Sequence, residues 1–158
     1  MRAVVQRVLE AAVSWTDAAG KEHTQGIGRG LAILVGAGPQ DRPEDADRLA
    51  DKIAQLRIFA DVEGRFNLSL EDVQGEALVV SQFTLYADLR RGRRPSFDGA
   101  APPDWARALC QHFADHLAAR GVTTRSGSFG AHMLVSLINE GPVTVALSTD
   151  QWDTRIGG

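Results

Sequence analysis

The chain has 158 residues, 44% of them hydrophobic, and this length suits one domain that buries about two thirds of its unfolded surface. A formal net charge of -3 excludes a molecule that is basic as a whole, so any contact with nucleic acid must come from a local patch. A single cysteine, a polar N-terminus and the lack of an apolar run of about 18 residues predict a protein of the reducing cytoplasm, with no internal disulfide and no membrane span.

The first third of the chain predicts β-structure. Residues 2–16 mix valine with polar residues in near-alternation, and the turn "TDAAGK" follows, which indicates a strand pair. Residues 31–38 form an apolar run bounded by glycines, as in a strand that is covered on both faces. The preceding "GIGRG" leads into this strand and not into a helix, so we interpret it as a turn and not as a phosphate loop.

Two helices are predicted. The first covers residues 41–59, with Asp41 and Glu44 as a capping box and Pro43 in the first turn. Its apolar face consists of Ala46, Leu49, Ala50, Ile53 and Leu56. The second runs from about Pro103 to Arg120 and ends at Gly121. Its apolar residues at helical spacing are Trp105, Leu109, Phe113 and Leu117.

The remaining predicted elements are strands. Residues 77–88, "ALVVSQFTLYAD", have the composition of a buried strand, and residues 133–148 alternate like a hairpin whose corner is "NEGP". Strands outnumber helices and do not alternate strictly with them. We therefore predict a single α+β domain over residues 1–158, with a mostly antiparallel sheet that forms a partly closed barrel.

Familiar catalytic signatures are absent from the sequence. His112 and His116 are one helical turn apart, but no third metal ligand is evident, so the sequence predicts no metal site. Cys110 has the setting of a small core residue and not of a nucleophile, and Ser128 lacks the nucleophile-elbow pattern.

Six stretches, in order, carry a more specific signal: "MRAVVQRV", "LRIFAD..GRFNLSL", "SQFTLYAD", "GRRPSF", "GSFGAHM" and "NEGPVT". Together they resemble the D-aminoacyl-tRNA deacylases, formerly called D-tyrosyl-tRNA deacylases, over almost the whole chain. Glu140 is a small departure, because aspartate is commoner there, and residues from about 148 to 158 form a surface extension past the family's usual end.

The resemblance implies a homodimeric hydrolase that cleaves the ester between a D-amino acid and the terminal adenosine of tRNA, without a metal or an organic cofactor. It implies catalysis at Ser81, Gln82, Phe83 and Thr84, mainly through backbone groups and the substrate's own 2′-hydroxyl. Thr84 as a nucleophile stays open. Supporting positions on the matched motifs are Arg7, Phe129, Met133 and Asn139.

The resemblance also explains the proline at the "NEGP" corner. In the family the Gly141-Pro142 bond is cis, and the pair enters the active site of the partner subunit, where it excludes L-residues. Arg7 then braces this corner from across the dimer. From its own residue type, Arg7 is equally well interpreted as an exposed strand arginine.

A basic loop follows the catalytic segment and predicts a grip on the phosphates of the tRNA acceptor end. Its cations are Arg90, Arg91, Arg93 and Arg94. Two alternatives remain at this stage: an RNA-binding module without catalysis, and a metal-dependent hydrolase that uses the two histidines.

Overall fold

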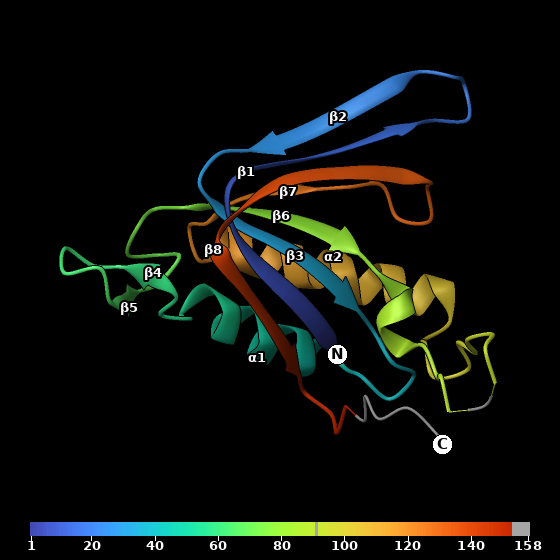
Figure 1. Cartoon of the computed structure of the whole chain (residues 1–158). Helices are drawn as coiled ribbons and strands as arrows, with labels where there is room; N and C mark the ends of the chain where they lie inside the picture. Colours follow the sequence, from blue (N-terminus) through green and yellow to red (C-terminus); the bar gives the residue numbers. More distant parts are fainter. Residues whose placement is uncertain (91, 153–158) are drawn as a thin grey trace.

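The computed structural model describes residues 1–90 and 92–152. The elements in chain order are β1 (Arg2–Thr16), β2 (Glu22–Ile27), β3 (Gly30–Gly36), α1 (Pro43–Ala54), β4 (Phe59–Ala60), β5 (Phe66–Leu68), β6 (Glu76–Ser81), the 3-10 turn η1 (Phe83–Tyr86), α2 (Pro103–Ala119), β7 (Thr123–Ser126) and β8 (Met133–Ser148). The predicted α+β class with two main helices is confirmed (Figure 1).

The long strand β1 organises the main sheet. Its first half pairs with β3, its second half pairs with β2, and β8 runs antiparallel along its other edge. The sheet curls into a nearly closed barrel, as predicted, but it is mixed, because β3, β6 and β7 run parallel to one another. The parallel pairing results from the two crossovers. Helix α1 lies between β3 and β6, and α2 lies between β6 and β7, so each following strand starts at the same end of the sheet as the one before it.

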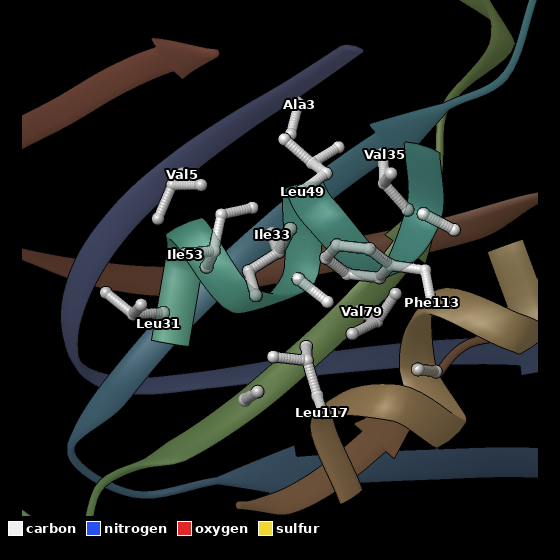
Figure 2. Close-up of a cluster of buried hydrophobic side chains, with 14 of the residues drawn as sticks. Ala3, Val5, Leu31, Ile33, Val35, Leu49, Ile53, Val79, Phe113 and Leu117 are labelled. Atoms are coloured by element: carbon white, nitrogen blue, oxygen red, sulfur yellow. The ribbon is translucent and has the colours of Figure 1, made fainter. Parts of the chain in front are cut away.

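Strands β3 and β6 are covered on both faces, which confirms the prediction from the apolar run at residues 31–38. On one face Ile33 and Val79 pack with Leu49 of α1 and Phe113 of α2 (Figure 2). On the other face Leu78 and its neighbours pack against the second half of β1 in a smaller cluster. Because successive strand side chains point to opposite faces, one strand serves both clusters.

Several predicted boundaries are wrong. Helix α1 ends at Ala54 and not at residue 59, and its cap is the Asp45 carboxylate, which accepts the Arg42 N–H (3.0 Å), in place of Asp41 and Glu44. Asp41 instead accepts bonds from the Gly38 N–H (2.6 Å) and the Tyr86 hydroxyl (3.0 Å). The Asp41 carboxylate therefore bonds groups outside the helix and does not cap α1.

The predicted hairpin over residues 133–148 is also wrong. These residues form the single strand β8, which pairs with β1 over nearly its whole length. Gln6 pairs with Thr144 and Val8 pairs with Asn139, so residues 140–143 bulge out of the ladder without reversing the chain. The "NEGP" corner is thus an interruption within one strand.

Candidate active site

The parallel strands bring three segments to one edge of the sheet. β3 ends at Gly36, β6 at Ser81 and β7 at Ser126, and the register places these ends side by side. The segments that follow β6 and β7 are η1 and the loop of residues 127–132. The Gly127 N–H donates to the Val79 carbonyl (3.1 Å), which ties this loop to β6.

The predicted catalytic residues lie where β6 ends. The predicted strand over residues 77–88 stops at Ser81, and Phe83–Tyr86 form a 3-10 turn, which corrects the sequence prediction. Gln82 donates its N–H to the Val35 carbonyl (2.8 Å) and accepts at its own carbonyl from the Leu85 N–H (3.3 Å). A helical turn leaves its first N–H groups without an internal partner, and here these belong to Phe83 and Thr84.

The side chains of Phe83 and Thr84 at the start of this turn are exposed, whereas Tyr86 at its end is buried. The exposed Phe83 ring makes an edge-to-face contact with Phe97, with centroids 5.0 Å apart. The Gln82 side-chain amide donates to the Thr84 hydroxyl. A hydroxyl nucleophile needs a general base, and in the described part of the chain no carboxylate or imidazole bonds the Thr84 hydroxyl.

Two of the predicted supporting residues lie on the loop after β7 and at the start of β8. Phe129 is half-buried against the main core, and the Arg107 guanidinium of α2 lies over its ring at 4.8 Å. Met133 packs against Gly127 so closely that a Cβ on this glycine would lie 2.6 Å from the sulfur. The contact between Arg107 and Phe129 was not predicted from the sequence, because Arg107 is one of many exposed polar residues on α2.

The Gly141-Pro142 bond is cis, as the resemblance implied. Asn139 closes the base of the bulge: its Oδ1 accepts the Val143 N–H (2.8 Å) and its Nδ2 donates to Thr144 Oγ1 (3.2 Å). Gly141 has φ of 140°, and a Cβ there would lie 2.7 Å from a Val143 methyl group. Only glycine fits this position without displacing the buried Val143.

Arg7 is buried, with 7% of its surface exposed, so its interpretation as an exposed strand arginine is wrong. Its Nε donates to the Glu140 carbonyl and lies 3.2 Å from the Glu140 carboxylate, while its NH1 donates to the Ile58 carbonyl. Arg7 therefore braces the corner of its own chain, and a brace from across the dimer stays a prediction. Glu140, the departure from the family pattern, supplies the carboxylate of this brace.

The corner and the η1 turn lie at opposite ends of the sheet. Arg7 pairs with Leu31 at the start of β3, and Arg2 pairs with Gly36 at its end. Five residues of strand separate them, which is about 17 Å at roughly 3.3 Å per residue. In Figure 1, β4 and β5 lie at one end of the molecule and the turn that follows β6 lies toward the other end. One chain alone therefore does not bring Pro142 to Thr84.

The basic loop lies between Asp88 and Ser96 and follows η1 in the chain. Asp88 and Ser96 close its base through two backbone bonds of 2.8 and 3.1 Å, and Arg90 pairs with Asp88 (2.6 Å). Arg93 and Arg94 are exposed. Arg91 lies outside the described residues.

The two histidines of α2 have a structural role. His112 bonds Asp47 of α1 (2.7 Å), and His116 bonds Asp47 and Asp51 (both 2.8 Å), so the pair ties the helices together. The hydrogen bond from His116 holds the pKa of Asp51 below its usual value. Within residues 1–90 and 92–152, no group of three or more His, Cys, Asp or Glu side chains is arranged to hold a metal ion.

Cys110 is buried in the core, where it contacts the Val35 carbonyl (3.7 Å). Burial raises the pKa of its thiol to about 12, so the nucleophilic thiolate is scarce at neutral pH.

None of the helices that the structure describes is long and apolar enough to cross a membrane.

Residues 4–148 match the family model described as D-Tyr-tRNA(Tyr) deacylase. The chain belongs to this family. The D-aminoacyl-tRNA deacylase of Roseiflexus sp. (strain RS-1) is 58% identical over 149 residues, which are 94% of each chain. The D-aminoacyl-tRNA deacylase of Thermotoga petrophila (strain ATCC BAA-488 / DSM 13995 / JCM 10881 / RKU-1) is 53% identical over 96% of this chain and 99% of its own.

Two solved structures share the deacylase fold. One, named "c-Myc DNA Unwinding Element Binding Protein", is 37% identical, with a TM-score of 0.85 over 95% of this chain and 99% of that chain. The other, "Structural Analysis of a probable eukaryotic D-amino acid tRNA deacylase", is 20% identical with a TM-score of 0.77, over 92% of this chain and 97% of that chain. The resemblance found in the six motifs is confirmed.

Proposed function

We propose that this protein hydrolyses the ester bond of D-aminoacyl-tRNA and releases the free D-amino acid and tRNA. The observation that carries the proposal is the exposed η1 turn, which lies on the family's "SQFTLY" segment and begins with N–H groups that have no partner inside the turn. An aminoacyl ester is already activated, so positioning and oxyanion stabilisation suffice without a catalytic triad.

In this mechanism, water attacks the ester carbonyl carbon, and the bond from that carbon to the 3′-oxygen of the terminal ribose breaks. The N–H groups of Phe83 and Thr84 stabilise the oxyanion, and each such donor contributes about 2.7–4 kcal/mol in other hydrolases. The vicinal 2′-hydroxyl of the substrate assists the proton transfer to the departing 3′-oxygen. The side chains of Gln82 and Thr84 orient the ester, and the hydrogen bond between them fixes their positions.

The separation of the corner from η1 supports a homodimer. A two-fold axis would place Gly141 and Pro142 of each subunit against the η1 turn of the other. Apolar side chains exposed on β1 and β8 supply a surface for this contact: Leu9, Leu134 and Ile138. A rigid main-chain wall at the corner would then exclude the side chain of an L-residue.

The exposed arginines of the basic loop support a tRNA substrate, because they lie next to the catalytic turn. We place the reaction in the cytoplasm, where aminoacyl-tRNAs are used, and we assign it to one domain formed by the whole chain. Residues 149–152 belong to this domain through the contacts of Thr149 and Asp150 with the N-terminal strand.

The decisive experiment is a deacylation assay on paired D-tyrosyl- and L-tyrosyl-tRNA. We expect rapid release of D-tyrosine and no acceleration with the L-substrate. Binding of both tRNAs without turnover would instead favour a nucleic-acid-binding module, the class that the name of one structural relative suggests for that relative. Loss of turnover in a chelator would favour a metal-dependent hydrolase.

A further inference from the structure

Residues 149–152 follow the part of the chain that the family model matches, and they pack against the first residues of β1. The Thr149 N–H donates to the Met1 carbonyl (2.9 Å), so the backbone contact with the N-terminal strand continues past the end of β8. Asp150 accepts hydrogen bonds from Nε and NH2 of Arg2, the shortest at 3.1 Å. The Trp152 ring lies 5.4 Å from the carbon at the centre of the same guanidinium. The tail thus holds the Arg2 side chain.

Arg2 in turn contacts the end of η1. Its NH1 donates to the Leu85 carbonyl (3.0 Å), and its guanidinium lies over the Tyr86 ring at 4.1 Å. The last carbonyls of a helical turn have no acceptor role inside the turn, and Arg2 gives one of them a donor. Tyr86 is fixed on its far side as well, because its hydroxyl donates to Asp41.

The contact between Arg2 and η1 borders an open space. Arg2, Thr84, Tyr86, Asp150 and Trp152 all border a cavity of about 780 Å³ behind the turn. Away from the open space, Tyr86 is buried against Gly38. The start of the turn is held by the bond from the Gln82 N–H to the Val35 carbonyl, and its end is held by the bond from Tyr86 to Asp41 and by Arg2.

We propose that residues 149–152 form a brace that positions the η1 turn through Arg2. Arg2 is a positioning residue, and Asp150 and Trp152 act through it. The proposal rests on the proposed function, because the geometry of η1 matters for ester hydrolysis only if its N–H groups stabilise the oxyanion. A catalytic group displaced by about 1 Å can cost on the order of 10²-fold in rate, so the support of a turn can control kcat without touching substrate.

The test compares three variants of the full chain. Asp150→Asn and Arg2→Met each weaken the brace, whereas Arg48→Ala removes a bond to the Thr149 carbonyl (3.2 Å) from a residue that contacts the tail and Asp45 but not η1. We expect kcat for D-tyrosyl-tRNA to fall roughly 10-fold in the first two, with little change in KM, and to stay unchanged in Arg48→Ala. The variant that combines Arg2→Met with Asp150→Asn should be no slower than Arg2→Met alone, because Asp150 contacts η1 only through Arg2.

Amide hydrogen exchange gives a readout that does not depend on activity. Exchange of the Leu85 and Ala87 amides, whose bonds close η1, should speed up in Asp150→Asn and Arg2→Met and not in Arg48→Ala. Unchanged kcat and unchanged exchange in the two brace variants would overturn the proposal. An equal loss in Arg48→Ala would also overturn it. An inactive wild-type protein would contradict the proposed function instead, and the exchange rates would still decide whether the brace exists.

Discussion

At the scale of single residues, Thr84 is the side chain whose role matters most for the mechanism. It is exposed, and its hydroxyl is bonded by the Gln82 amide. A hydroxyl without a neighbouring base is a poor nucleophile, whereas the Thr84 N–H is present whatever its side chain is. The proposed catalysis therefore depends on the backbone of this residue.

We predict that Thr84→Ala keeps activity within roughly 10-fold of wild type, since it removes only one positioning contact. By contrast, tRNA that ends in 2′-deoxyadenosine and is charged on its 3′-hydroxyl should be hydrolysed on the order of 10²-fold more slowly, because its proton relay is missing. Single-turnover rates on both substrates measure the effect. A folded, substrate-binding Thr84→Ala enzyme that is inactive, with normal turnover of the deoxy substrate, would make Thr84 the nucleophile.

Cys110 provides a second prediction at this scale. Because burial raises the pKa of its thiol to about 12, the thiolate fraction stays small until the pH approaches that value. A thiol-alkylating reagent should therefore leave native protein unmodified at pH 8 and modify it only after denaturation. Cys110→Ala should keep kcat. Rapid alkylation of the native protein with parallel loss of activity would contradict the assignment of Cys110 to the core.

At the scale of elements, we propose that the basic loop serves substrate binding and not the chemical step. Its base is closed by the Asp88 and Ser96 backbone pair, and it follows directly on η1. Cations in this position can contact phosphates of the acceptor end while the reacting ester lies on the turn.

We predict that replacing both Arg93 and Arg94 by alanine raises KM and largely keeps kcat. The slope of log binding constant against log salt should fall by about 1.4 to 1.8, at 0.7 to 0.9 per lost phosphate contact. Arg48→Ala with Lys52→Ala is the matched control, because it removes two exposed charges from α1. Equal tRNA affinity and equal slopes in both double variants would show that the loop only faces solvent.

At the scale of the whole molecule, the proposed site would be incomplete within one chain. The corner that would select chirality lies about 17 Å of strand away from the turn that would hydrolyse the ester. The proposed isologous dimer would complete both sites at once, because a two-fold axis exchanges the two corners reciprocally.

We predict that Leu134→Glu with Ile138→Glu converts the protein to a folded monomer that lacks deacylase activity. Burying two new carboxylates at an apolar interface costs several kcal/mol, which is enough to dissociate a dimer of ordinary affinity. Sedimentation equilibrium measures the mass, and Ala118→Glu on the exposed face of α2 serves as control. A wild-type monomer with full activity would refute the dimer and the exclusion mechanism together.

The sequence by itself determined the elements and the motifs. Periodic apolar residues predicted both helices, and the glycine-bounded run at residues 31–38 predicted a strand covered on both faces, because these patterns depend on local chemistry and on burial. The resemblance of six motifs led to the family, which the comparisons confirmed. Local pattern failed at Asp41, which bonds Tyr86 instead of capping α1, and at residues 133–148, which read as a hairpin but form one strand.

Only the tertiary structure decided where the functional residues lie relative to one another. It buried Arg7 against its own corner, placed the predicted catalytic segment on a 3-10 turn, and connected residues 149–152 to that turn through Arg2. It also placed the corner and η1 at opposite ends of β3. The physical reason is that strand register and crossover direction fix distances between residues far apart in the chain, and no local pattern of side chains encodes them.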